Sequence, residues 1–339
     1  MSRLRSSALT QIDTASRAEV PRGSSHNGGV QLPPHVREAI ERIAERAGKA
    51  GPASLKRAAA EMSDAYRAGK VPPRSTTTES TAAYLVTRMP ATYAAARAVL
   101  RETHRLLGGR EISSVLDLGA GSGAASLAAL EEYPAAAVTL IDRDWALLEA
   151  ARQWLPQARA MAEDVARMPT LAPHDLVMLA YSAGEIAKLP LAKLWKAARV
   201  ALVIIEPGTP RGFAVVRAAR SELLAAGAHM IAPCPGEGAC PVVDPDWCHF
   251  AARVERSSLH RRIKGADLGY EDEKYSYVAL AREPVTPALA RIVGRPRHRP
   301  GLIELDTCTP GGLTTVRASK RDRDRFRAAR HAEWGAPGI

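Results

Sequence analysis

The chain has 339 residues, of which 46% are hydrophobic and 24% are charged, which is typical of a globular protein with room for two or more domains. No run approaches 18 uninterrupted apolar residues, so we expect no membrane-spanning helix. The formal net charge of +11 favours a polyanionic partner such as nucleic acid, although an arginine-rich genome would produce the same balance.

The first segment, residues 1–30, is rich in Ser, Arg and Gly and shows no periodicity, so it predicts a disordered tail. It also lacks the apolar core of a secretory signal. We therefore expect a cytoplasmic protein in a reducing compartment.

Residues 31–107 predict an N-terminal helical domain. A helix begins after Pro33 and carries one apolar stripe, made of Val36, Ile40 and Ile43. A second helix is expected over 54–67 and a third over 81–107. Met89-Pro90 should restart or kink the third, because proline removes a backbone donor and clashes with the preceding turn.

Residues 108–285 alternate apolar strands with helices, from the strand at Val115 to the strand that ends near Glu206. Such alternation with short connections predicts an α/β domain, in which a parallel sheet is covered by helices on both faces.

The first strand-to-helix turn of this domain contains Gly119, Gly121 and Gly123 at alternate positions, with Asp117 two residues before it. Glycines let the backbone approach a ligand closely and direct helix N–H groups toward it. Dinucleotide sites use similar turns, so the glycines alone do not identify the ligand. The second strand ends in Asp142, 19 residues after Gly123, where a carboxylate can accept hydrogen bonds from ribose hydroxyls.

Together with Glu163 and Asp164 after the third strand, this arrangement resembles the S-adenosylmethionine site of class I methyltransferases. The resemblance implies a Rossmann-like methyltransferase sheet, with Asp117 near the methionine end, the glycines around it, Asp142 on the ribose and Asp164 near the adenine. The alternative for Asp142, Glu163 and Asp164 is that they cap helices.

All cysteines of the chain lie in its last third, and three of them share the Pro/Gly-rich stretch 231–250; the four are Cys234, Cys240, Cys248 and Cys308. Thiolates select iron–sulfur clusters or zinc, and the C-x5-C-x7-C spacing matches no common zinc finger. We therefore expect one four-thiolate metal centre in a Cys-rich insertion, with iron–sulfur favoured over zinc. Two disulfides or four inert buried thiols are the alternatives, and His249 could replace one thiolate in a zinc site.

Basic residues flank this stretch on both sides. Residues 286–339, a basic C-terminal segment that carries the fourth cysteine, contain 11 Lys and Arg against 5 Asp and Glu. Five further cations follow the third cysteine and are candidate RNA contacts: Arg253, Arg256, Arg261, Arg262 and Lys264. The alternative is a solvated charged face. Residues 311–339 could form a basic helix that orders on RNA.

Three further motifs accompany the cysteines: YLVTRMPATY before the sheet, Glu206-Pro207-Gly208-Thr209-Pro210, and Trp247-Cys248-His249-Phe250. With them, residues 35–310 resemble the Rsm22 family of small ribosomal subunit proteins. The resemblance implies a class I methyltransferase domain behind a helical region, a [4Fe-4S] cluster on the four cysteines, and association with the small ribosomal subunit and its rRNA during assembly. A radical enzyme is disfavoured, because such enzymes take three ligands from a compact C-x3-C-x2-C loop.

The catalytic residues are not evident. Enzymes that methylate exocyclic amines commonly place an Asn/Asp-Pro-Pro-aromatic run after the fourth strand, whereas this chain has residues 179–185, LAYSAGE. Carbon-5 methylation of pyrimidines needs a nucleophilic cysteine, and all the cysteines already have a proposed role. Tyr181 and Glu185 are the candidates for facing the base. We therefore expect an rRNA methyltransferase or assembly factor, or alternatively a non-catalytic ribosome-binding protein that keeps the cofactor and the metal for structure.

Overall fold

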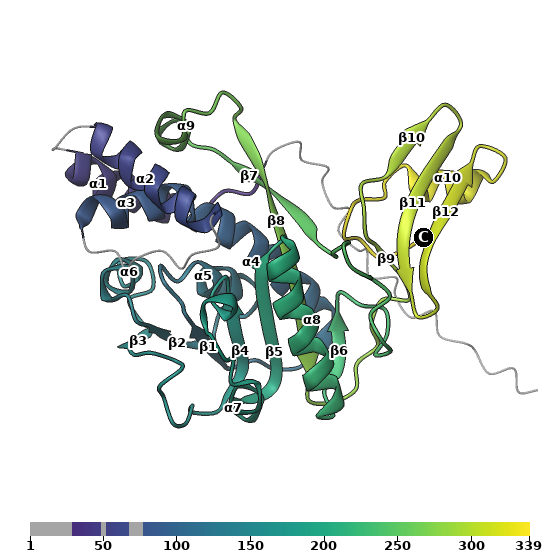
Figure 1. Cartoon of the computed structure of the whole chain (residues 1–339), viewed down its shortest axis with the longest axis horizontal. Coiled ribbons are helices and arrows are strands. Elements are labelled where there is room, and N and C mark those ends of the chain that lie inside the picture. Colours follow the sequence, from purple (N-terminus) through teal and green to yellow (C-terminus); the bar gives the residue numbers. More distant parts are fainter. Residues whose placement is uncertain (1–28, 49–51, 68–76) are drawn as a thin grey trace, which may run out of the picture.

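The computed structural model describes residues 29–48, 52–67 and 77–339 (Figure 1). Of the tail predicted at 1–30, all but residues 29 and 30 lie outside the described residues. Within the described ranges, no helix is both long enough and apolar enough to cross a bilayer.

The N-terminal region is helical as predicted, with α1 (Pro34–Ala47), α2 (Pro52–Arg67), α3 (Thr78–Thr87) and α4 (Met89–Leu107). The break predicted at Met89-Pro90 is confirmed, because α3 ends at Thr87 and Pro90 stands in the first turn of α4. Helix α3 begins three residues earlier than expected, since the Thr77 side chain accepts a hydrogen bond from the Ser80 backbone N–H at 3.1 Å and caps the helix.

A sheet of eight strands forms the centre of the molecule, with β3-β2-β1-β4-β5-β8-β6 in order and β7 paired to β8. The strands are β1 (Ser114–Leu118), β2 (Ala137–Asp142), β3 (Arg159–Ala162), β4 (His174–Ala180), β5 (Ala198–Pro207), β6 (His229–Ala232), β7 (Phe250–Glu255) and β8 (Tyr270–Ala281). Strands β1 to β5 are parallel, as predicted. The expectation of a wholly parallel sheet is wrong, because β8 lies antiparallel between β5 and β6.

Helices cover both faces of this sheet, because successive strand residues point to opposite sides and both sides are apolar. Val115 belongs to an apolar core that also contains residues of α4, α5 (Ala124–Glu132) and α6 (Trp145–Ala151). Its neighbour Leu116 belongs to a second core with residues of α7 (Leu191–Ala197) and α8 (Pro210–Ala225). The architecture is thus a Rossmann-like α/β fold with a mixed sheet.

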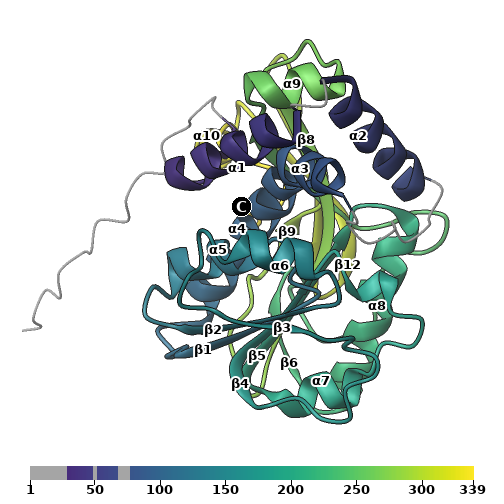
Figure 2. The same ribbon diagram turned by 90° about the vertical axis from the view of Figure 1, so that its left-hand side faces the viewer.

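Helices α1, α2 and α3 gather with α9 (Ser258–Lys264) at one end of the sheet (Figure 2). A short 3-10 turn, η2 (Ala183–Glu185), follows β4 at the same end. The helical region therefore lies over the carboxyl ends of the parallel strands, where ligands bind in open α/β sheets.

The C-terminal region forms a second sheet, in the order β10-β11-β12 with β9 paired to β11. Its elements are β9 (Arg291–Ile292), β10 (Arg297–Arg299), β11 (Leu302–Thr309), β12 (Gly312–Ser319) and α10 (Arg323–Ala329). A small apolar core made of Ile292, Ile303, Leu305, Ala318 and Ala329 holds α10 against it. Residues 311–339 are therefore not one basic helix, since the β11–β12 hairpin takes up their first part.

Candidate functional site

A cavity of about 760 Å³ opens where the carboxyl ends of β1, β2 and β4 face helices α2 and α3. Its volume is typical of a site for a small molecule. Its lining includes most of the residues predicted to hold S-adenosylmethionine, and the polar ones are Ser54, Arg57, Glu61, Thr77, Glu79, Ser80, Tyr84, Arg88, Thr92, Asp142, Arg143, Asp144, Glu163, Asp164, Tyr181, Ser182 and Glu185.

The glycine turn after β1 forms part of the cavity floor through Gly119 and Gly121. Gly119 has φ +69°, and a Cβ there would stand 2.3 Å from the Cβ of Ser182, so only glycine lets the two loops approach this closely. Gly123 does not line the cavity, and a Cβ there would meet Leu155 at 2.7 Å. Its lack of a side chain lets the start of α5 pack closely against Leu155, which follows α6, and against Ala151, the last residue of α6.

Asp142 lies at the end of β2 and lines the cavity, as predicted. Its Oδ2 accepts a hydrogen bond from the Gly121 backbone N–H at 2.7 Å, and its Oδ1 accepts one from the Asp144 N–H at 2.7 Å. The helix cap is Asp144, whose Oδ1 accepts from the N–H of Ala146 at 3.1 Å. The alternative that Asp142 caps α6 is therefore wrong, and its carboxylate keeps further lone pairs that can face a ligand.

Asp117 differs from the other predicted cofactor residues because it does not line the cavity. Its side chain is buried, and its Oδ2 accepts a hydrogen bond from the Ser126 hydroxyl at 2.7 Å. Burial raises the pKa of Asp117 to about 7. The structure therefore places Asp117 behind the glycine turn, where it ties β1 to the first turn of α5.

Glu163 and Asp164 follow β3 and both line the cavity. Asp164 Oδ1 accepts a hydrogen bond from the Ala166 N–H at 2.9 Å, which folds the loop after β3 and leaves the other oxygen near Arg167 at 3.6 Å. Both acids thus share the cavity with Asp142, at the edge where an adenine was predicted.

The candidates for facing the substrate, Tyr181 and Glu185, also line the cavity, from the loop after β4. Tyr181 has φ +62°, an uncommon backbone conformation for a bulky residue, and Arg88 lies over its ring at 5.9 Å from the centroid. Burial, and then the charge of Glu273, raise the pKa of Tyr181 well above its usual value. Glu185 pairs with Arg143 at 3.3 Å.

Sequence reasoning assigned no role to Glu206, although the residue belongs to a motif that was singled out. Its side chain is buried, and its carboxylate accepts backbone N–H groups of Gly184 and Ala183, which holds the η2 turn in place. Burial raises the pKa of Glu206 to about 7. The turn that carries Glu185 therefore rests on a buried carboxyl group.

Acidic groups outnumber basic groups around the large cavity. Its lining contains seven carboxyl groups and three guanidinium groups: Glu61, Glu79, Asp142, Asp144, Glu163, Asp164 and Glu185 against Arg57, Arg88 and Arg143. This balance favours a cationic ligand and opposes entry of a phosphate chain.

All four cysteines line one second cavity, of about 140 Å³, between α8, β8 and the second sheet. Cys308 reaches it from β11, and the charges of Cys234 and Cys240 contribute, after burial, to raising the pKa of Cys308 to about 11. All four thiols are free, so the disulfide alternative has no support here. In the described part of the chain, no group of three or more His, Cys, Asp or Glu side chains could hold a metal ion, so the expected metal centre is not supported by the structure.

His249 does not join the cysteines. It is absent from the lining of their cavity, and its ring lies between Trp247, at 5.5 Å between centroids, and Trp334, at 4.9 Å. The expectation that His249 could replace one thiolate is therefore not supported by its position.

Two buried arginines adjoin the cysteine cavity, and sequence reasoning missed both because nothing in their local sequence distinguishes them from surface arginines. Arg291 donates to the carbonyl oxygens of Pro233 at 3.0 Å and Gly335 at 2.8 Å, and it pairs with Glu102 at 2.7 Å. Arg220 lines the cavity and donates to the carbonyl oxygens of Gly236 and Gly238.

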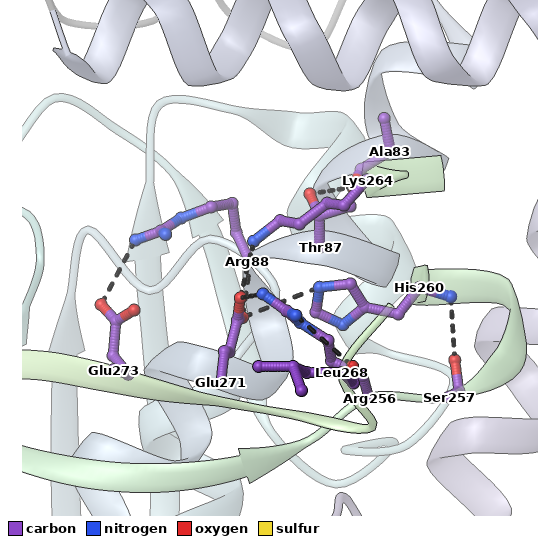
Figure 3. A network of polar contacts seen from close by, with 10 residues as sticks. All are labelled: Ala83, Thr87, Arg88, Arg256, Ser257, His260, Lys264, Leu268, Glu271 and Glu273. Carbon is purple, nitrogen blue, oxygen red and sulfur yellow. Dashed lines mark hydrogen bonds and ion pairs between the residues drawn. The ribbon is translucent and has the colours of Figure 1, made fainter. Parts of the chain in front are cut away.

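Two of the predicted RNA contacts, Arg256 and Lys264, point into a network within the protein (Figure 3). Arg256 pairs with Glu271 at 2.7 Å and Lys264 with the same carboxylate at 3.1 Å, beside the buried His260. Both cations pair with this one carboxylate, and Arg256 keeps only 15% of its side chain exposed.

The other three predicted RNA contacts remain near the surface. Arg253 pairs with Asp272 at 2.9 Å and lies over the ring of Tyr270. Arg261 and Arg262 are exposed on α9, and no carboxylate within the described ranges forms an ion pair with either of them. The structure thus separates this set into three cations that pair with carboxylates and two, both on α9, that form no ion pair among the described residues.

Comparison with known proteins finds similar sequences, similar solved structures and a matching family. Two Schizosaccharomyces pombe proteins named Rsm22-cox11 tandem protein, mitochondrial, are each 24% identical over 184 residues, which is 40% of this chain and 24% of theirs. The chain thus matches about a quarter of the length of these relatives.

Solved structures of similar shape include a SAM dependent methyltransferase from Aquifex aeolicus and the precorrin-6y C5,15-methyltransferase from Geobacter metallireducens. The first is 16% identical with a TM-score of 0.35 and covers 59% of this chain and 95% of that one. The second is 16% identical with a TM-score of 0.36 and covers 55% of this chain and 86% of that one. These values are too low to transfer a substrate or the role of a residue.

The family described as Mitochondrial small ribosomal subunit Rsm22 matches residues 78–337, more than three quarters of the chain. The match includes the glycine turn, Asp142 and all four cysteines. This chain therefore belongs to the Rsm22 family.

Proposed function

We propose that this protein binds S-adenosylmethionine in the large cavity and acts on the small ribosomal subunit as an rRNA methyltransferase or assembly factor, with a metal centre on its four cysteines. The observation that carries the proposal is the position of Asp142 beside the glycine turn at the cavity floor. Membership of the Rsm22 family supports the ribosomal partner.

The volume of the cavity and the charge of its lining suit S-adenosylmethionine. Gly119 and Gly121 leave room for close approach of the ligand, and Asp142 retains acceptor capacity for ribose hydroxyls. The excess of carboxyl groups around the cavity favours a sulfonium cation over a polyphosphate. The bound cofactor would supply the methyl group.

The chain's own contribution to a transfer would come from the loop after β4. Tyr181 offers a ring that can position a base, and Arg88 and the buried Glu206 fix the loop from either side. Because the cavity is acidic, we propose that the acceptor enters as a single base or amine while the phosphate backbone stays outside.

The cysteine cavity fits a metal–thiolate centre by its donor set, which consists of four soft sulfur donors. Among the described side chains no group of three or more could hold a metal ion, so the proposal depends on the donor set and on the family resemblance. We propose a [4Fe-4S] cluster, with zinc as the alternative, held by Cys234, Cys240, Cys248 and Cys308.

The partner surface we propose includes the exposed cations of α9, Arg261 and Arg262, and the basic strands of the second sheet. Replacing both α9 arginines by Ala should weaken binding to rRNA and lower the dependence of log affinity on log salt by about 1 for each phosphate that is no longer neutralised. Arg152→Ala at the C-cap of α6, an exposed arginine paired with Glu149, is the control. Unchanged affinity and salt dependence in the double variant would remove α9 from the proposed surface.

Two measurements test the main proposal. Calorimetry with S-adenosylmethionine tests the cavity, and transfer of a labelled methyl group to small-subunit precursor particles tests catalysis. Metal analysis of anaerobically purified wild type and Cys308→Ser tests the metal centre, which should be lost in the variant. Absence of both cofactor binding and metal from the wild type would refute the proposal.

A non-catalytic assembly protein is the second candidate, and the surroundings of Tyr181 favour it. Its side chain is held between Arg88 and the charge of Glu273, and its loop, LAYSAGE at 179–185, has no Asn/Asp-Pro-Pro-aromatic run. Tight cofactor binding without methyl transfer, under conditions in which RNA binds, would favour this candidate.

A further inference from the structure

Arg220 is a buried cation beside the cysteines, outside the large cavity. Its side chain projects from α8 and the residue keeps 6% of its surface exposed. Transfer of a guanidinium group from water to a protein interior costs several kcal/mol unless an anion compensates its charge.

The partners of Arg220 in the described part of the chain are neutral. Its guanidinium donates to the carbonyl oxygens of Gly236 at 3.0 Å and Gly238 at 2.7 Å, both in the cysteine loop. Its Nε is buried without a hydrogen-bond partner. No carboxylate of the described residues forms an ion pair with it, so no acid among them compensates its positive charge.

Arg291, which donates to the carbonyl oxygen of Pro233 in the cavity lining, provides the contrast. It is even more buried, with 2% of its surface exposed, but Glu102 neutralises it at 2.7 Å. Two buried arginines therefore border the same thiols, and within the described ranges only Arg291 has its own carboxylate. The side chains that line the cavity together with Arg220 include all four cysteines.

We infer that Arg220 is the counter-charge of an anionic metal–thiolate centre in this cavity, and that it positions the cysteine loop around that centre. The inference rests on the metal centre proposed above. Four thiolates carry more negative charge than a bound zinc ion or the core of a [4Fe-4S] cluster supplies in positive charge, so the loaded centre is anionic in either case. Arg220 would then compensate the negative charge of the centre. Through its two carbonyl contacts it would also hold residues 236–238 over the centre.

The test compares Arg220→Gln with wild type as full-length protein purified anaerobically. We expect the variant to lose its metal to excess chelator about ten- to hundredfold faster, the range typical when a partner of the metal ligands is removed. Bathophenanthroline is the probe for iron and EDTA the probe for zinc. Arg217→Gln is the matched control, because Arg217 lines the same cavity from the same helix but pairs with Asp244 at 3.3 Å.

A second readout separates charge compensation from plain packing. Thermal unfolding is measured for metal-loaded and chelated forms of both proteins, and Arg220→Gln should lower the melting temperature of the loaded form more than that of the chelated form. If Arg220 only packs the loop, both forms lose the same amount. Arg220→Lys keeps the charge, so it should retain metal better than Arg220→Gln and is the fallback if the latter does not fold.

The possible outcomes separate the two proposals. The role of Arg220 is overturned, while the metal centre stands, if Arg220→Gln retains its metal as long as wild type does and if the substitution lowers the melting temperatures of the loaded and chelated forms equally. A wild-type protein that holds no metal after anaerobic purification and reconstitution would overturn the metal centre and this inference together.

Discussion

Replacing Asp142 by Asn gives the sharpest test of the cofactor site. Each carboxylate oxygen accepts one backbone N–H, from Gly121 and from Asp144, both at 2.7 Å. Asn keeps one acceptor oxygen and turns an NH₂ group toward the other N–H. The variant therefore loses a charge-assisted hydrogen bond within the protein and the charge that would hold the ribose.

The expected loss of cofactor affinity follows from the hydrogen bond to the ribose, which is weaker with a neutral amide than with a carboxylate. A hydrogen bond to a charged group contributes about 1.5–3 kcal/mol, which corresponds to a decrease of about ten- to 150-fold in affinity for S-adenosylmethionine. Titration calorimetry with the cofactor measures this affinity, and urea denaturation reports the accompanying decrease in stability.

The matched control is Asp175→Asn, at the opposite end of the same sheet. Asp175 accepts hydrogen bonds from the backbone and hydroxyl of Ser113 and from the hydroxyl of Ser114, at 2.7–2.9 Å. It should lose stability without losing cofactor affinity. If Asp142→Asn binds the cofactor within twofold of wild type, the assignment of Asp142 to the ribose is wrong.

Three further changes probe the loops around the cavity. Gly119→Ala places a Cβ 2.3 Å from that of Ser182, at a residue with φ +69°. It should lower the free energy of unfolding, measured in urea, by at least about 2 kcal/mol and weaken cofactor binding. A variant of wild-type stability would contradict the tight packing. Burial raises the pKa of Glu206 to about 7, so the stability that its protonated form contributes is complete below its unfolded pKa of 4.5 and is lost as pH rises through 7. Relative to Glu206→Gln, wild type should therefore lose about 2–3 kcal/mol of unfolding free energy between pH 4.5 and 8. Parallel pH profiles of the two proteins would contradict this. Tyr181→Phe should keep any methyl transfer, while Tyr181→Ala should abolish it if the ring positions the base; equal activity of the two would exclude that role.

The elements of the parallel half of the sheet could be predicted from the sequence because they depend on local pattern. Strands such as β1 are apolar on both sides, which requires helices on both faces, and a glycine turn with an acid at the next strand end identifies the ligand edge. The break at Pro90 and the position of Asp142 have the same local origin. These features involve residues within about one strand–helix–strand unit of each other.

The tertiary structure decided what depends on contacts between distant segments. Strand β8 enters the sheet antiparallel, Cys308 reaches the other thiols from a separate sheet, and Asp117 turns away from the cavity it was expected to line. Burial also separates arginines that look alike in the sequence, since Arg220 and Arg256 point inward while Arg261 stays exposed. Charge composition alone gives the number of cations, but only packing determines which of them have a partner inside the protein.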